Sequence, residues 1–369
     1  MNSSKTISAL ILVVCILALS FRAMSADSIE DGSLKTINVG SLQQLYSALE
    51  MANKSGFTKI ILANGQYFIK KTLLVKRDHI SIVSRSGDPA KAILTGNGMR
   101  ATPRVDNLML VTGKHFTLQG ITLEQSGNHL IQISGEHDAD FPTIEHCILQ
   151  DSYEQLLKVS YNKKTQVASD YGIVTQTIFR YTAGIGPQFY IGGIDVHGGH
   201  HWKVTKNKFE NIASPSLKVA EHAVHFWNNT KNILVDKNTI INSDRGIGFG
   251  MEGRPALGGV ISNNLILHTN NYHPFADVGI IIEETENTQI VNNKIFLAHP
   301  YPNAIEYRFE TTKNTIIENN LTNKPIRKRN GGNASLNSNN RSLTLSDFAS
   351  IDTLTEAGFE LNVDTLFIK

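Results

Sequence analysis

The sequence predicts an all-β protein in which short parallel strands stack into a solenoid, and three observations lead to this prediction. The first is a repeated segment with an apolar residue three positions before an Asn and another two positions after it. The Asn residues recur at spacings of 31, 25, 30 and 26 residues, and other side chains take the same slot earlier in the chain: Asn207, Asn238, Asn263, Asn293 and Asn319, preceded by Gln119, His146 and Gln176. We expect these Asn side chains to form a structural ladder along the stack.

The second observation is the composition of the repeated segments. Apolar residues alternate with polar ones, as in Val204 to Phe209 and Val235 to Ile240, and β-branched residues are frequent. This pattern predicts strands, because a helical array needs two amphipathic helices in every repeat. Equivalent residues of successive coils then lie about 4.8 Å apart.

The third observation is a second aligned set of strands. Its first apolar residues stand 13 to 16 residues before the next Asn slot: Ile194, Val224, Ile247, Ile280 and Ile305. Because side chains alternate along a strand, we expect the intervening residues to face outward in columns. One column is small, and we expect it to form the floor of a groove: Gly193, Ala223, Gly246, Gly279 and Ala304.

The two ends of the chain differ from its middle. Lys5, the apolar run from Ile7 to Leu19 and Ala23-Met24-Ser25 predict a signal peptide over residues 1–25 and therefore a secreted or periplasmic protein. Leu42, Leu45, Ala48, Leu49 and Ala52 share one face of a predicted helix that caps the first coil, with Ser41 as its N-cap. We expect the parallel strands to occupy residues 26–323, and residues 324–369 to form a flexible basic and Asn-rich segment followed by a C-terminal cap.

Composition excludes some partners. The formal net charge is +2 over 369 residues, which gives no electrostatic reason to expect nucleic acid or a membrane as partner of the mature chain. Cys147 is the single Cys after the expected cleavage, so no intrachain disulfide is expected, and we expect a monomer.

The leading strand, the Leu-x-x-Ala-Leu helix and the segment Lys59-Ile60-Ile61-Leu62-Ala63-Asn64-Gly65-Gln66-Tyr67 resemble the right-handed parallel β-helix (pectate-lyase-like) superfamily. Within it, the N-terminal segment is similar to the chondroitinase-B and alginate-lyase branch. The resemblance implies a right-handed parallel β-helix that acts on polysaccharides. The superfamily also contains polygalacturonases, C5-epimerases and non-catalytic adhesins, so the reaction stays open. The groove columns lack the paired Lys and Arg of the lyases, the Asp trio of the polygalacturonases and the Asp-Pro-His-Asp motif of the epimerases.

Chemistry-bearing residues gather on the expected outer face of the second strand set. The residues expected to bind substrate lie there and in its loops: Asp195, Trp227, Glu283, Glu306, Tyr190 and Tyr272. Glu221, Asp244 and Asp277 come from consecutive coils, so we expect either Ca²⁺ between them or neutralisation by Arg245. A zinc site from His197, His200, His201 and His225 is an alternative without a recognised spacing.

Two chemistries suit this face. A lyase acting on a uronate needs a base and neutralisation of the sugar carboxylate, so we expect His225 as base, His197 as alternate base or acid, and Arg245 or Arg308 as the neutralising cation. A glycoside hydrolase needs two carboxylates about 5–5.5 Å or about 6.5–9.5 Å apart, for which Glu221 and Asp244 are suitable. The sequence therefore favours an exported lyase with an acidic polysaccharide as partner. A hydrolase, a C5-epimerase and a non-catalytic glycan-binding or adhesive protein are the alternatives.

Overall fold

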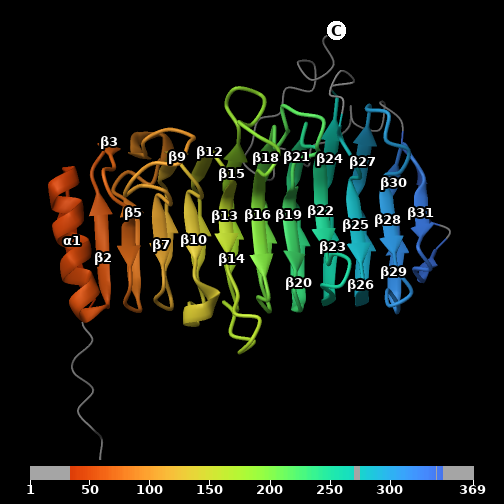
Figure 1. Ribbon diagram of the computed structural model, residues 1–369, viewed down its shortest axis with the longest axis horizontal. Coiled ribbons are helices and arrows are strands. Elements are labelled where there is room, and N and C mark those ends of the chain that lie inside the picture. The colour runs from red at the N-terminus through yellow and green to blue at the C-terminus, as the bar shows by residue number, and fades with distance from the viewer. Residues whose placement is uncertain (1–33, 270–274, 338, 344–369) are drawn as a thin grey trace, which may run out of the picture. The chain divides into compact units, whose positions relative to one another are not determined.

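The computed structural model describes residues 34–269, 275–337 and 339–343 of the chain. These residues belong to one compact unit that begins at Leu34. The expected signal peptide and residues 344–369 lie outside the described residues. The described strands form three sheets of 12, 10 and 11 strands, in which every strand pairs in parallel with the equivalent strand of the next coil. The coils follow one another from α1 (Leu42–Ser55) to the last coil (Figure 1).

Each coil contributes one strand to each sheet. Sheet A contains β1 (Lys35–Val39), β2 (Thr58–Leu62), β5 (Ile80–Ser84), β8 (Thr117–Gln119), β11 (Thr143–Glu145), β14 (Ile173–Thr175), β17 (Lys203–Thr205), β20 (Thr230–Asp236), β23 (Ala256–Ser262), β26 (Thr285–Val291), β29 (Thr315–Glu318) and β32 (Ala334–Leu336). Sheet B contains β3 (Gly65–Phe68), β6 (Ala92–Thr95), β9 (Thr122–Ser126), β12 (Ile148–Ser152), β15 (Ile178–Arg180), β18 (Lys208–Glu210), β21 (Thr239–Ile241), β24 (Leu265–His268), β27 (Lys294–Leu297), β30 (Leu321–Thr322) and β33 (Arg341–Ser342). Sheet C contains β4 (Leu73–Val75), β7 (Met109–Val111), β10 (Ile131–Ile133), β13 (Gln155–Val159), β16 (Gly192–His197), β19 (His222–Trp227), β22 (Arg245–Phe249), β25 (Ile280–Glu283), β28 (Ile305–Arg308) and β31 (Ile326–Arg329). Two short 3₁₀ helices, η1 (Pro89–Lys91) and η2 (Gly135–His137), lie between strands.

The N-terminal helix caps the stack as the sequence predicted. The Ser41 hydroxyl accepts a hydrogen bond from the Gln44 backbone N–H at 3.3 Å, and Gly56 ends the helix at a positive φ of 69°. The helix contacts β1, β2 and β4 and buries one apolar face: Leu45, Ala48, Leu49 and Ala52. The apolar interior of the first coil is therefore covered by this helix.

The register of sheet C agrees with the sequence pattern. Ile194, Val224 and Ile247 are direct neighbours on successive strands, and Ile280 and Ile305 continue the row. All five side chains are fully buried in one continuous core. The spacing of apolar residues was therefore sufficient to align these coils.

The Asn ladder is present, but two of its members are displaced by one residue. The ladder residues are Asn207, Asn238, Asn264, Asn293, Asn320 and Asn340, and each Nδ2 donates to a backbone carbonyl while each Oδ1 from Asn238 onward accepts from the preceding coil. Asn263 and Asn319 instead adopt left-handed backbone at φ 54° and 55°. The ladder position directly follows the left-handed position in the chain. Where two Asn residues occupy both positions, the sequence pattern alone does not show which of them belongs to the ladder.

Two of the earlier slots follow the same rule, whereas Gln119 lies in β8 and the following Gly120 has the positive φ, at 65°. His146 and Gln176 have positive φ, and the residues after them, Cys147 and Thr177, continue the ladder. The residue before the ladder residue therefore turns the corner, and the ladder residue satisfies the buried backbone groups of the turn.

Two expectations were wrong. The small column does not face outward: Ala223 and Ala304 belong to the core, and a Cβ added at Gly193 or Gly246 would meet the core side chains Phe209 and Ile266. At the start of these strands two consecutive residues are buried in the core, as Leu156 and Leu157 also are. The coils also do not end at residue 323, because the basic stretch forms β31 and is followed by β32 and β33.

Candidate functional site

The outer face of sheet C carries the candidate site. Strand register places one row of side chains across seven successive coils: Lys158, Asp195, His225, Gly248, Ile281, Glu306 and Arg327. A second row contains His197 beside Trp227, and, farther along, Glu283 beside Arg308 and Arg329. The sheet therefore brings together the expected His, Trp, Glu and Arg residues, as the sequence register predicted.

Lys158 is a site residue that the sequence reasoning missed. Its ammonium contacts the Asp195 carboxylate, and Nζ lies 2.7 Å from His197 Nε2. Leu157-Lys158-Val159 aligns with Ile194-Asp195-Val196, so extending the outward register by one coil toward the N-terminus would have identified it.

Asp195 is buried among three polar side chains. One oxygen accepts a hydrogen bond from the Trp227 indole N–H at 2.7 Å, and the other faces Lys158 and His197. Burial by itself would raise the pKa of this carboxyl, but the charge of Lys158 and the hydrogen bond to His197 hold the pKa of Asp195 well below its usual range. Asn228 Nδ2 lies 2.8 Å from His197 Nδ1, so both ring nitrogens of His197 have partners.

His225 and Trp227 are more enclosed than the sequence predicted. The His225 side chain is 2% exposed, its Nε2–H donates to the Gly250 carbonyl at 3.1 Å, and burial lowers its pKa. Its ring stacks on Trp227 with 5.1 Å between centroids. Arg254 covers the Trp227 ring at 4.7 Å and His197 tilts against it at 4.3 Å, so Trp227 is not an open platform for a sugar.

His222 is the second residue that the sequence reasoning missed. Its ring lies 4.4 Å from that of His225 and extends over Gly248, where an added Cβ would come within 2.7 Å of Nε2. The residue is 5% exposed, and neither ring nitrogen has a hydrogen-bond partner in the described structure. Burial, reinforced by the charges of His225 and Arg245, lowers the pKa of His222 well below its usual range.

The expected metal ligands are not brought together. Asp244 accepts hydrogen bonds from the backbone N–H groups of Ser214 and Ala220 at 2.9 and 2.8 Å, which fixes a loop, and Asp277 pairs with Arg245 at 3.2 Å. Among the described residues these three carboxylates do not form a group with the close spacing of metal ligands. In the described residues three side chains that could hold a metal ion lie close together: the ligand atoms of Glu221, His222 and His225 are within 4.8 Å of one another.

The alternative zinc set also does not form. His200 pairs with Asp170 at 3.3 Å. His201 stacks on Tyr171 with 4.9 Å between ring centroids, at a corner of the coil rather than on the outer face of sheet C.

A cavity of about 230 Å³ opens on the site face over β19 to β31. It is lined by His222, His225, Arg245, Gly250, Met251, Glu252, Asp277, Ile281, Glu283, Tyr301, Glu306, Arg308 and Arg329. Three of its carboxylates pair with Arg side chains: Asp277 with Arg245, Glu283 with Arg308, and Glu306 with Arg329. Burial raises the pKa of Glu283 in spite of Arg308.

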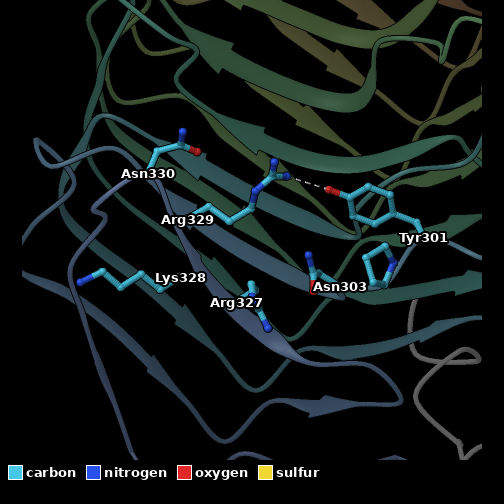
Figure 2. Close-up of a pocket in the computed structure, with 7 residues that line it drawn as sticks. Tyr301, Asn303, Arg327, Lys328, Arg329 and Asn330 are labelled. Carbon is cyan, nitrogen blue, oxygen red and sulfur yellow. Dashed lines mark hydrogen bonds between the residues drawn. The ribbon is translucent and has the colours of Figure 1, made fainter.

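A wider cavity of about 650 Å³ adjoins the first and shares Tyr301 and Arg329 with it (Figure 2). Its lining is cationic and polar: Tyr301, Pro302, Asn303, Arg327, Lys328, Arg329 and Asn330. The Tyr301 hydroxyl donates to Glu306 at 2.6 Å and accepts from Arg329 at 3.1 Å, and burial raises its pKa. The two cavities together carry five cationic side chains: Arg245, Arg308, Arg327, Lys328 and Arg329.

The other expected substrate-binding residues have different positions. Glu283 and Glu306 both line the cavity, and Glu306 is fully buried and fixed by Tyr301, Asn303 and Arg329. Tyr190 is 40% exposed in the loop before β16 and is accessible to a ligand. Tyr272 lies outside the described residues.

Fold and sheet register define a right-handed parallel β-helix protein with a charged face on one sheet. The family model for a right-handed β-helix region matches residues 192–354. No curated protein matches the chain in sequence. No helix in the described part of the chain is long and apolar enough to span a membrane.

Similar solved structures include an alginate lyase from Paenibacillus sp. str. FPU-7, which is 14% identical with a TM-score of 0.60. The alignment covers 82% of this chain and 99% of that one. A PL6 alginate lyase in complex with a trisaccharide is 15% identical with a TM-score of 0.49, covering 79% of this chain and 72% of the other. At 14% identity and a TM-score of 0.60, the likeness to the Paenibacillus structure shows the fold.

Proposed function

We propose that the protein is an exported enzyme that cleaves an acidic, uronate-containing polysaccharide by β-elimination. The observation that carries this proposal is the pair of adjoining cavities on the outer face of sheet C, whose lining carries five cationic side chains and four carboxylates. Arg327 and Lys328 are the cations outside the three Arg–carboxylate pairs. A groove-like site with fixed cations favours an anionic polymer over a neutral one.

The cations meet the main requirement of the reaction. Elimination removes the proton α to the sugar carboxylate, breaks the bond to the leaving oxygen and leaves a carbon–carbon double bond, so negative charge must be stabilised beside the carboxylate. Arg245 binds Asp277 through Nε, and Arg308 binds Glu283 and Asn330 through Nη1 and Nε. Each guanidinium carries five N–H donors, so both retain donors for a substrate carboxylate.

We assign proton transfer to His197, which lies on the coil before the cavity and outside its lining, in place of His225. The side chain of His197 is 19% exposed, whereas the His225 ring is covered and uses Nε2 to hold the Gly250 carbonyl. Lys158, Asp195 and Asn228 fix the His197 ring, and Lys158 supplies a second exchangeable proton 2.7 Å away. A positioned acid–base group contributes about 10²–10⁴-fold to rate.

Three of the four carboxylates that line the cavity favour elimination over hydrolysis. A glycoside hydrolase needs one carboxyl group to donate a proton and a second to act as base or nucleophile. Asp277, Glu283 and Glu306 are each held in an ion pair with Arg, and Glu306 is also fully enclosed. Breaking such pairs to free two catalytic carboxyls is unfavourable.

The test is incubation of the protein with alginate, pectate, chondroitin and a neutral glycan while ultraviolet absorbance from unsaturated uronate is followed. Alginate belongs in the panel because the similar Paenibacillus structure is an alginate lyase. We expect absorbance to rise with at least one acidic glycan, and His197→Gln to lower the rate by about 10²-fold or more. His146→Asn is the matched control, because His146 lies exposed at a left-handed corner position that Asn tolerates.

The other outcomes identify the alternatives. New reducing ends without a double bond indicate a hydrolase, a changed uronate epimer ratio without cleavage indicates an epimerase, and binding without any change in the glycan indicates an adhesive protein. Export predicts that protein recovered outside the cytoplasm begins at Ala26, which intact-mass measurement detects.

A further inference from the structure

His222 is the starting point, because its two ring nitrogens are buried without a hydrogen-bond partner. A neutral imidazole normally uses one nitrogen as donor and the other as acceptor. Leaving a buried polar group without a partner is unfavourable. Gly248 beneath the ring leaves room for this placement, since any Cβ there would collide with it. The fold therefore holds an imidazole with an available lone pair at the wall of the 230 Å³ cavity, although this placement is unfavourable for the imidazole itself.

His225 presents a second lone pair at the same place. Its Nε2–H donates to the Gly250 carbonyl at 3.1 Å, which places the proton of the neutral ring on Nε2 and leaves Nδ1 as an acceptor. Metal-bound His residues usually donate their other ring N–H to a carbonyl or carboxylate in this way, which fixes the tautomer. The Gly250 contact thus orients His225 as a ligand.

Glu221 completes the set with a carboxylate on the residue preceding His222 in the chain. The ligand atoms of Glu221, His222 and His225 lie within 4.8 Å of one another. Tetrahedral ligands at about 2.0–2.1 Å from a metal lie roughly 3.3–3.4 Å apart. Side-chain rotations that move the ligand atoms by about an ångström would therefore bring the three residues to this spacing. The flanking charges are already paired, since Arg245 binds Asp277 and Asp195 binds Lys158.

We propose that Glu221, His222 and His225 bind a divalent transition metal, for which Zn²⁺ is the best match. Two imidazoles and one carboxylate are a donor set that suits Zn²⁺. Three protein ligands leave a fourth position, and the two His residues line the cavity, so that position faces the space assigned to substrate. This role rests on the proposed function: the ion would share with Arg245 the neutralisation of the uronate carboxylate.

Metal binding is measured directly on the full chain without a polyhistidine tag. The protein is dialysed against EDTA, freed of chelator and titrated with Zn²⁺ in competition with a chromophoric chelator. We expect one tight equivalent, and Co²⁺ loaded in its place should give the intense visible absorption of a four-coordinate site. His222→Ala and Glu221→Gln should each weaken Zn²⁺ binding by about 100-fold or more, since loss of an outer-shell partner alone costs about 10–100-fold.

His146→Asn again serves as control and should bind Zn²⁺ as the unmodified chain does. Glu221→Gln keeps the size of a half-buried side chain, so it tests the site even where His222→Ala does not fold, as judged by circular dichroism. Equal Zn²⁺ affinity for Glu221→Gln and the unmodified chain, or no tight equivalent at all, overturns the proposal.

The two proposals fail separately. If the protein binds one Zn²⁺ but acts on no acidic glycan, the metal centre is confirmed and its catalytic role is refuted. Unsaturated uronate produced by a chain that binds no Zn²⁺ sustains the lyase and removes the metal centre.

Discussion

Replacement of Asn264 by Ala tests which Asn of each Asn-Asn pair forms the ladder. Asn264 accepts hydrogen bonds from the Asn238 backbone N–H at 2.9 Å and from Asn238 Nδ2 at 3.0 Å. Its own amide donates to the Val235 carbonyl and to Asn293 Oδ1, both at 2.9 Å. All four contacts are buried, and Ala makes none of them.

The expected loss follows from these contacts. The orphaned Asn238 N–H costs about 1–3 kcal/mol, and the remaining three hydrogen bonds contribute about 0.5–1 kcal/mol each because their partners keep other contacts. We therefore expect Asn264→Ala to lower the free energy of unfolding by about 2.5–6 kcal/mol. Asn263→Gly is the matched control: Asn263 is left-handed, its side chain makes one exposed hydrogen bond to Asp236, and Gly adopts the same φ, so we expect a loss below about 1 kcal/mol.

Guanidinium chloride denaturation followed by circular dichroism measures both variants against the unmodified chain. A larger midpoint shift is expected for Asn264→Ala than for Asn263→Gly. Similar shifts, or the reverse order, would refute the ladder register and with it the division between ladder and corner positions.

Three further predictions address burial. Burial lowers the pKa of His129 to about 4, whereas the pKa in the unfolded chain is near 6.5. Stability is therefore highest above pH 6.5, and about 3 kcal/mol of the free energy of unfolding is lost as the pH falls to 4. His129→Gln should flatten the stability–pH curve in this window, and parallel curves for the two proteins would contradict this. Burial raises the pKa of the Cys147 thiol to about 12, so it should react with a disulfide reagent after denaturation but not in the native protein, where rapid labelling would place it at the surface. A Cβ at Gly246 would lie 2.1 Å from the Gly279 carbonyl oxygen, so Gly246→Ala should lower stability by about 1–3 kcal/mol in thermal melts. Gly40→Ala is the control and should be near neutral, because a Cβ at Gly40 would make only an ordinary van der Waals contact. Equal melting temperatures for the two variants would mean that the small column faces solvent.

Much of the site could be placed from the sequence because neighbouring strands pair residue by residue, so one aligned pair of residues fixes the alignment of the others. Once Ile194 and Val224 were aligned, the row containing Asp195 and His225 followed, since side chains alternate along each strand. Lys158 was available to the same reasoning and was missed only because the pattern was not extended to the preceding coil.

Pairing and burial could not be read in the same way. The sequence places Asp244 and Asp277 in one acidic column, but Asp244 binds loop backbone N–H groups and Asp277 binds Arg245. These partners come from loops and from neighbouring coils, so their identity depends on how the coils pack. His222 precedes the alternating run in sequence and was therefore not considered, although its ring reaches His225.

The sequence by itself determined the stacked parallel strands, the capping helix and the face that carries the charged residues. Each of these depends on periodicity: an apolar residue every second position, a coil every 25 to 31 residues and a helical repeat at Leu45, Ala48 and Ala52. The tertiary structure alone decided which side chains are covered, which carboxylates are paired, and that Glu221, His222 and His225 converge beside a cavity. Those properties depend on side-chain directions at the starts of strands and on contacts between coils, and periodicity carries no information about either.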